Sequence, residues 1–275
     1  VFYQASGGPV KIESITSESL VSAIRLQSYA NNTLLNYNET MGIPEGSLST
    51  KYIFPVYENK WAPLNSQIRF AHLGSGDKTI RVTIGAAHWD YVVAQGQDKR
   101  ISLDRSGGPV IVESLDGLTN IIAAIRLQSY ANNTLLDYNE TMGIPESALS
   151  TKYIFPVYEN KWAPLNSQIR FAHFSAETKK IKVTIGTEVV WYDDVLPNTE
   201  KRLFFDRSGG PVIIESDDGL TRIVAAIRLQ CFANNVLNCY SETMGIPIED
   251  LAPTYYFPVY ENLWAPLNSQ VRFGV

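Results

Sequence analysis

The sequence predicts an all-β protein of tandem immunoglobulin-like sandwiches, with about seven strands in each repeat of about one hundred residues. A long block, Arg25–His72, returns as Arg126–His173 with three substitutions and again, more divergent and shortened, as Arg228–Phe273. Within each repeat, apolar and polar residues alternate in short runs between clusters of Gly, Pro, Asn and Asp, as half-buried strands do. Seven short alternating strands per hundred residues are typical of a two-sheet sandwich.

Each predicted strand rests on local alternation or on a short apolar run. In the first period we expect strands near residues 10–13, 24–26, 52–57, 68–70, 80–84, 89–93 and 101–103. The clearest is Ile80–Ile84, where apolar side chains flank Arg81 and Thr83. Pro44 and Pro145 are expected to open one short helical turn each. The Ser6–Pro9 motif and the Asn-rich block Phe232–Asn238 are interpreted as turns.

The repeat fixes the period but not the boundaries of the modules. Ser6 recurs as Ser106 and Ser208, which gives a period of 100 to 102 residues and one possible frame. We favour a second frame: a partial module at 1–64, complete sandwiches at 65–165 and 166–264, and the opening strand of a further module at 265–275. In either frame the sequence starts and stops in mid-period, as expected of a piece of a longer array. Unfinished strands leave backbone that a neighbouring chain can pair with.

Composition narrows the class of protein. With 45% hydrophobic and 19% charged residues, the chain is too apolar for disorder. A net charge of -5 disfavours nucleic-acid binding, which asks for a basic face. No apolar run is long enough to span a membrane, and Val1 does not begin a recognisable secretory signal.

Several short motifs resemble a known repeat. They are Gly8-Pro9-Val10, Met41-Gly42-Ile43-Pro44 and Phe54-Pro55-Val56-Tyr57, with their copies in the later periods. Together they resemble a repeat of about a hundred residues found in large secreted and surface proteins of filamentous bacteria. The turn at Ala71-His72-Leu73 departs from the family pattern, so the hairpin loop there is expected to differ. The resemblance implies an extracellular structural or adhesive role and provides no catalytic residues.

Signals of enzymatic chemistry are weak. The three histidines, His72, His88 and His173, lack the spacing to Ser, Cys or carboxylates that a catalytic triad or a metal site needs. We expect them at the surface ends of strands. The Ser-Gly-Gly-Pro motif precedes a strand instead of a helix, so it does not predict a phosphate site. The sequence therefore predicts no catalytic residues, no metal and no cofactor.

Paired acidic and polar residues allow two interpretations each. Asp193-Asp194 and Asp217-Asp218 lie in predicted turns, where they either bind calcium through carboxylate oxygens or are simply solvated. Glu58-Asn59 recurs as Glu159-Asn160 and Glu261-Asn262. These pairs either bind a cation at a module junction or end a strand.

Tryptophan and asparagine carry two further hypotheses. Trp61, Trp162 and Trp264 recur in a shared Trp-Ala-Pro-Leu-Asn motif and are expected to pack between modules or to contact a sugar ligand. Asn31, Asn38, Asn132 and Asn139 each begin an Asn-X-Thr pattern, the acceptor for N-glycosylation.

The two cysteines are expected to form a disulfide. Cys231 and Cys239 replace Ser28 and Asn36 of the first repeat. Two polar positions that both change to cysteine within one repeat suggest that these positions touch. A disulfide would fit an oxidising compartment; two buried free thiols are the alternative.

Two functions follow as hypotheses. The first is a structural or adhesive fibre protein of the extracellular space or cell surface, whose partners are copies of itself joined head to tail. The second is a carbohydrate-binding array attached to a larger secreted protein, for which surface glycans would be the partners. Substitution of Trp162 by Ala, followed by glycan-array binding, distinguishes the two.

Overall fold

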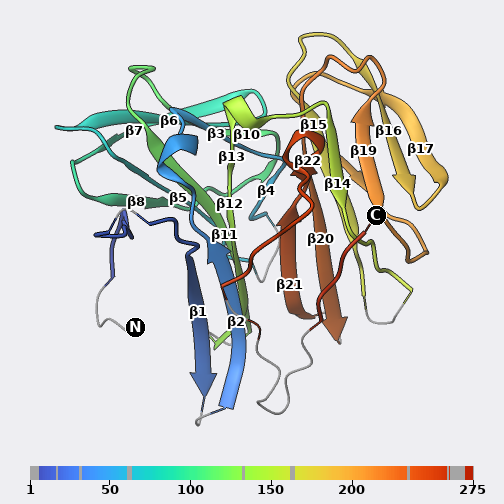
Figure 1. Cartoon of the computed structure of the whole chain (residues 1–275), viewed down its shortest axis with the longest axis horizontal. Coiled ribbons are helices and arrows are strands. Elements are labelled where there is room, and N and C mark those ends of the chain that lie inside the picture. The colour runs from blue at the N-terminus through green and yellow to red at the C-terminus, as the bar shows by residue number, and fades with distance from the viewer. Residues whose placement is uncertain are drawn as a thin grey trace.

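The regular secondary structure of the protein is almost entirely β (Figure 1). The computed structural model describes residues 6–16, 18–30, 33–60, 64–131, 134–161, 165–233, 236–258, 260 and 270–274. The described helical segments are three short 3-10 turns, η1 (Glu45–Ser47), η2 (Glu146–Ala148) and η3 (Ile248–Asp250). Each begins directly after a proline of the repeated Gly-Ile-Pro motif. The turns expected after Pro44 and Pro145 are confirmed.

The strands group into two similar two-layer units. The first has a five-stranded antiparallel sheet in the order β13 (Ile144–Pro145), β3 (Lys51–Phe54), β10 (Val110–Ser114), β6 (Lys78–Ile84), β7 (Ala87–Val93). Its four-stranded sheet has the order β12 (Thr134–Met142), β11 (Ile121–Ala131), β5 (Gln67–His72), β8 (Asp98–Ile101). A short ladder joins β4 (Tyr57–Glu58) to β9 (Ser106–Gly107).

The second unit repeats this plan one period later. Its larger sheet has the order β17 (Glu188–Val195), β16 (Lys179–Ile185), β19 (Val212–Ser216), β14 (Lys152–Phe155), β22 (Ile246–Pro247). Its smaller sheet has the order β18 (Lys201–Leu203), β15 (Gln168–His173), β20 (Ile223–Ala233), β21 (Val236–Met244). The first repeat contributes the hairpin of β1 (Ala23–Ala30) and β2 (Thr33–Met41), which forms a sheet of two strands.

Alternation along the strands builds the core of each unit. Ile80, Val82 and Ile84 on β6 are fully buried, with Arg81 and Thr83 on the other face. They pack with Ile68 and Phe70 of the facing sheet in one apolar cluster. Full burial of such side chains stabilises by about 1.5–3 kcal/mol each, so the alternation that predicts the strands also specifies the core.

The units start and end elsewhere than the boundaries expected near Asn65 and Asn166. The sheets of the first unit span residues 51–145, and those of the second span 152–247. β3 and β4 come before Asn65 in sequence, yet they pair with β10 and β9. In addition, residues 10–13, expected to form a strand, and residues 270–274, expected to open a further module, form no strand.

Three segments interpreted as turns are strands. The Ser-Gly-Gly motif of the second repeat forms β9, in which Gly107 lies opposite Tyr57. The Asn-rich block continues β20 and β21 to within two residues of each other, so it is a long hairpin. Asp193 and Asp194, also expected in a turn, lie within β17. In each case pairing with another strand overrides the local turn signal.

Cys231 and Cys239 are joined by a disulfide, with their Cα atoms 5.0 Å apart. They lie opposite each other on β20 and β21, next to a register shift that all three hairpins share. Direct cross-strand placement, and not a turn between strand ends, brings the two residues together.

Removal of this disulfide is expected to cost roughly 2–3 kcal/mol, the chain-entropy value for so small a loop. We expect the C231S/C239S double variant to fold with a lower midpoint in urea. Mass spectrometry of the unreduced chain, alkylated after unfolding, should find no free thiol. Two alkylated cysteines in the native preparation would contradict the bond.

The expectation that all histidines lie at the surface is wrong for two of them. His72 and His173 are buried, and their Nε2 atoms lie 3.1 Å and 2.9 Å from the carbonyl oxygens of Val93 and Val195. His72 follows Ile68 and Phe70 at the same alternating positions of β5, so it shares their inward face. His88 is exposed.

The Asp217-Asp218 turn is held by hydrogen bonds of its own. Asp218 accepts from the backbone N–H groups of Leu220 and Thr221 and from the Thr221 hydroxyl. These hydrogen bonds, that of the Thr221 hydroxyl foremost, hold the pKa of Asp218 well below its usual range. Asp116 makes the same contacts one repeat earlier. This aspartate therefore closes the turn in both repeats.

Candidate functional site: the contact between successive repeats

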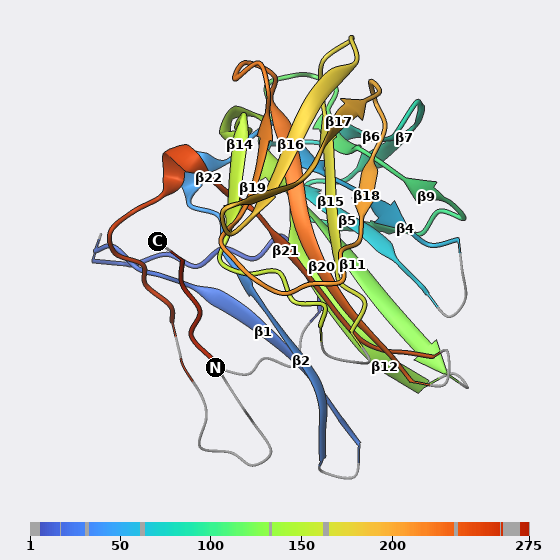
Figure 2. The ribbon, with the colours of Figure 1, turned by 90° about the vertical axis from the view of Figure 1, so that its right-hand side faces the viewer.

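The hairpins of the three repeats lie side by side. In Figures 1 and 2, β1–β2, β11–β12 and β20–β21 extend toward the same side of the molecule. β12 packs against β2 of the preceding repeat and against β21 of the following one. The contact between repeats therefore occurs twice, in nearly the same form.

Side chains of the Asn-Glu-Thr motif hold the backbone of the next repeat. Asn38 Oδ1 accepts a hydrogen bond from the Glu140 N–H at 3.1 Å, and Thr40 Oγ1 donates to the Glu140 carbonyl at 3.1 Å. Both polar groups of one peptide position are thus satisfied by the preceding hairpin. Buried backbone groups without such partners are costly, which makes this contact specific for register.

The same contact recurs at the second junction. Asn139 Oδ1 accepts from the Glu242 N–H at 3.3 Å, and Thr141 Oγ1 donates to the Glu242 carbonyl at 3.3 Å. The third repeat carries Ser241 and Thr243 at the equivalent positions. A hydroxyl at position 241 can still accept a backbone hydrogen bond, so the pattern continues chemically into the third repeat.

The contact with the next repeat involves two of the predicted glycosylation sites, Asn38 and Asn139. Asn139 is only 6% exposed and its amide oxygen is engaged, so a glycan there would require the stacked hairpins to separate. Asn38 is half-buried and makes the equivalent contact. Asn31 and Asn132 lie outside the described residues, and their modification stays a prediction.

Asp137 occupies the centre of the second stack. It is 3% exposed, and its carboxylate accepts from the Tyr240 backbone N–H. Burial raises its pKa to about 7, although that hydrogen bond favours the charged form. The position is Asn36 in the first repeat, which can accept a hydrogen bond without any charge to desolvate.

Asp137→Asn is therefore expected to stabilise the protein above neutral pH. The pKa of Asp137 is raised on folding, so the unfolded chain releases its proton first and wild-type stability falls between about pH 4 and pH 7. At 1.36 kcal/mol per pKa unit, the gain at pH 8 is expected to be about 2–4 kcal/mol, and less than half of that at pH 5. Urea unfolding at the two pH values measures it. An equal effect at both would contradict a charged, buried Asp137.

An ion-pair network lies in the same junction, on the side of β4. Glu58 of the first unit is 7% exposed and contacts two guanidinium groups of the second unit, Arg170 at 2.8 Å and Arg228. Arg228 also pairs with Glu242 at 2.8 Å. Both arginines are 1% exposed, so the carboxylates supply the counter-charge that solvent cannot.

Further partners complete the network. Three guanidinium groups and three carboxylates take part: Arg170, Arg202, Arg228, Glu58, Glu200 and Glu242. The numbers of positive and negative groups match, as burial of charge demands.

The charge pairing also follows the repeat. Glu159, the equivalent of Glu58, lies 2.6 Å from Arg272, the equivalent of Arg170. At the N-terminal side Arg69 and Arg126 hold the corresponding places, and both contact Glu140. Of the two interpretations of Glu58, the structure shows that it ends β4, and the cations that it contacts at the junction are arginine side chains. In the described part of the chain, no group of three or more His, Cys, Asp or Glu is arranged to hold a metal ion.

Apolar side chains complete the junction. Ile53 and Ile144, on the outer face of the first unit, belong to the same buried cluster as Ala172 and Val224 of the second unit. β20 is consequently buried on both of its faces, and Val224, Ala225 and Ala226 are all 0% exposed. A strand covered on both sides needs a neighbour beyond its own sandwich.

The predicted tryptophan site lies in parts of the chain that the structure does not describe. Trp61, Trp162 and Trp264 all lie outside the described residues, so their packing or ligand contact stays a prediction. Within the residues that the structure describes, no helix has the length and apolar content that crossing a membrane requires.

Comparison with known proteins gives little. No family model matches the chain, and no curated protein matches it. Among solved structures, an anti-sigma factor domain-containing protein aligns with 73% of this chain and 82% of its own at 9% identity, with a TM-score of 0.17. Similarity at that level carries no argument about fold or function.

Proposed function

We propose that the chain is a non-enzymatic structural or adhesive repeat protein of the extracellular space or cell surface. Its units would be tandem immunoglobulin-like sandwiches that associate head to tail by exchanging strands. The observation that carries this proposal is the repeated junction, with the same side-chain contacts to Glu140 and Glu242. The disulfide supports an oxidising compartment.

The edge of β1 that faces away from β2 is where strand exchange would occur. β11 and β20 each have a second neighbour, β5 or β15, whereas β1 pairs with β2 alone among the described residues. The segment 270–273 repeats the sequence of β5 and β15. Its side chains Val271 and Phe273 are 70% and 83% exposed, while Ile169 and Phe171 are 0% exposed.

The internal register specifies the exchanged pairing. Ile169 lies opposite Ile227 in the second unit, so Val271 of one copy would lie opposite Ile24 of the next. Addition of a strand to an open edge supplies main-chain hydrogen bonds, and the alternate side chains supply specificity. Each copy would thus extend the sheet of its neighbour.

Self-association tests the proposal. We expect concentration-dependent oligomers in sedimentation velocity and filaments of regular rise in electron microscopy. Val271→Asp should abolish both, because it places a charge at a buried position of the paired sheet. Val271→Ile, which restores the residue of the other repeats, should preserve them. A chain that stays monomeric at high concentration would contradict the proposal.

A further inference from the structure

The N-terminal segment exposes apolar residues that are core residues elsewhere. Val10 and Ile12 are 60% and 55% exposed, whereas Val110 and Val112, their equivalents on β10, are 0% exposed. The equivalents on β19, Val212 and Ile214, are also 0% exposed. Two of the three copies of this segment are therefore the centre of a sandwich, whereas residues 10–13 of the first copy form no strand.

The third repeat also exposes large apolar residues whose equivalents are buried. Tyr255, Tyr256 and Phe257 are 49%, 77% and 75% exposed. Their equivalents on β3 are Tyr52, Ile53 and Phe54, which are 0% or 1% exposed. Large aromatic side chains in a contiguous exposed run mark an interaction surface.

Inside the first unit these two segments are direct partners. β3 and β10 pair antiparallel, with Phe54 opposite Val110 and Tyr52 opposite Val112. β3 comes from one repeat and β10 from the next. The same relation places segment 255–257 opposite segment 10–12 of a following repeat.

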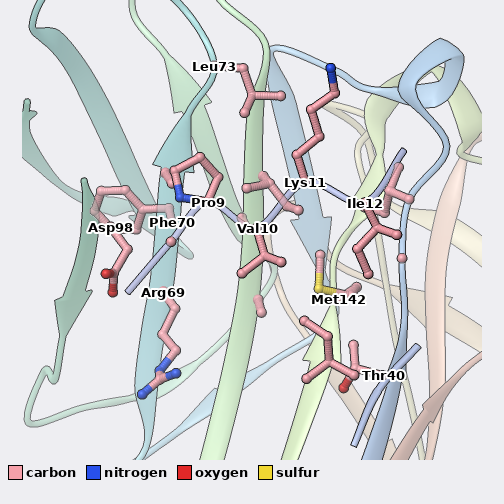
Figure 3. A pocket seen from close by; sticks show the side chains of 18 of the residues that line it. Pro9, Val10, Lys11, Ile12, Thr40, Arg69, Phe70, Leu73, Asp98 and Met142 are labelled. Atoms are coloured by element: carbon pink, nitrogen blue, oxygen red, sulfur yellow. The ribbon is translucent and has the colours of Figure 1, made fainter. Parts of the chain in front are cut away.

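A cavity of about 400 Å³ lies beside the N-terminal segment. Val10, Ile12, Phe70 and Met142 all line it, and Figure 3 shows Met142 between Val10 and Ile12, with Phe70 on the far side of Val10. The cavity reaches Ile122 on β11, the equivalent of Val224. At the internal junction, Ile53 packs in the cluster that holds Val224.

We propose that this cavity binds the segment Tyr255–Phe257 of a second copy of the chain, paired antiparallel to Val10–Ile12. Phe257 lies opposite Val10, Tyr255 lies opposite Ile12, and the Tyr256 side chain fills the cavity as Ile53 fills the internal junction. This inference rests on the proposed head-to-tail function and assigns its second contact, next to the edge of β1, whose Ala23 and Ile24 also line the cavity.

Gly8 provides a selective test. At Gly108 an added Cβ would lie 1.9 Å from the Pro55 carbonyl oxygen, whereas at Gly8 the nearest atom is Asp98 Cβ at 3.6 Å. Pro258 of the second copy is the equivalent of Pro55. Gly8→Ala should therefore leave the fold of one copy intact and block the approach of Pro258 of the second copy.

The experiment mixes two full-length single variants, V10C and F257C, under mild oxidation and counts the mixed disulfide dimer by mass. A mixture of K11C and F257C is the control, because neighbouring residues of a strand point to opposite faces. We expect at least about fivefold more mixed dimer from the first pair, since the control side chains diverge, and its loss when G8A is added to V10C.

The outcomes separate this inference from the proposed function. If copies associate in sedimentation but both pairs cross-link equally, or G8A has no effect, the cavity assignment is overturned and the proposed function stands. If copies neither associate nor cross-link, both are overturned.

Discussion

Glu58→Ala is expected to lower the free energy of unfolding by about 3–5 kcal/mol, the usual cost of removing one partner from a buried ion pair. Glu58 contacts Arg170 and Arg228, which are both 1% exposed. Without this carboxylate, Arg170 would keep Glu200 and Arg228 would keep Glu242. Each of these buried guanidinium groups would then lose one of its two carboxylate contacts, and with it part of the counter-charge that water cannot replace.

The repeat supplies a matched control for this prediction. Glu159 is the equivalent carboxylate, but its partner Arg272 has a 39% exposed side chain. Exposed pairs contribute about 0–1 kcal/mol, so Glu159→Ala should have little effect. Urea unfolding of the two variants, followed by tyrosine and tryptophan fluorescence, measures the difference. Equal losses for both variants would show that burial of the network is not what makes Glu58 important.

The all-β class could be predicted because local and tertiary signals agree along most strands. Ile80, Val82 and Ile84 alternate with polar residues, and burial follows that alternation residue by residue. The same logic applied to β5 would have placed His72 inside with Phe70. The prediction of a surface position rests on the place of His72 at the end of a strand, although its alternation with Phe70 indicates the core.

The junction could not be predicted because its partners are distant in sequence. Glu58 and Arg228 are separated by 170 residues, and no local pattern connects them. The Asn-Glu-Thr motif is the local pattern of a glycan acceptor, and this pattern does not indicate a contact with the next repeat. The usable signal was the repeat itself, since a contact made once between neighbouring repeats is expected to recur.

The predicted module boundaries differ from the extent of the sheets for a related physical reason. The first unit takes β3, β5 and β6 from one repeat and β10 to β13 from the next, and the second unit repeats this plan, so strands of neighbouring repeats pair within one sheet. Sequence identity between periods says which residues are equivalent, but not which of them share a sheet. The cysteine pair could be predicted because both substitutions lie in one hairpin, so the prediction did not depend on which strands share a sheet.

Gly108→Ala is expected to destabilise the protein by about 3 kcal/mol or more, at or above the usual range for overpacking. The added Cβ would lie 1.9 Å from the Pro55 carbonyl oxygen and 3.1 Å from Val56 Cα, and both are backbone atoms that cannot rotate away. The strand pair β4–β9, which begins two residues after Pro55, would have to move apart. Gly210→Ala should behave alike, because its Cβ would lie 2.1 Å from the Pro156 carbonyl oxygen.

Gly8→Ala is the control at the equivalent position of the first repeat. Its added Cβ finds only Asp98 Cβ, at an ordinary contact distance of 3.6 Å, so we expect a change within about 0.5 kcal/mol, as for most surface substitutions. Thermal and urea unfolding of the three variants at low protein concentration, where copies are dissociated, give the comparison. A loss at Gly8 as large as at Gly108 would contradict the explanation, because the cost would then come from the motif itself and not from the strand that crosses it.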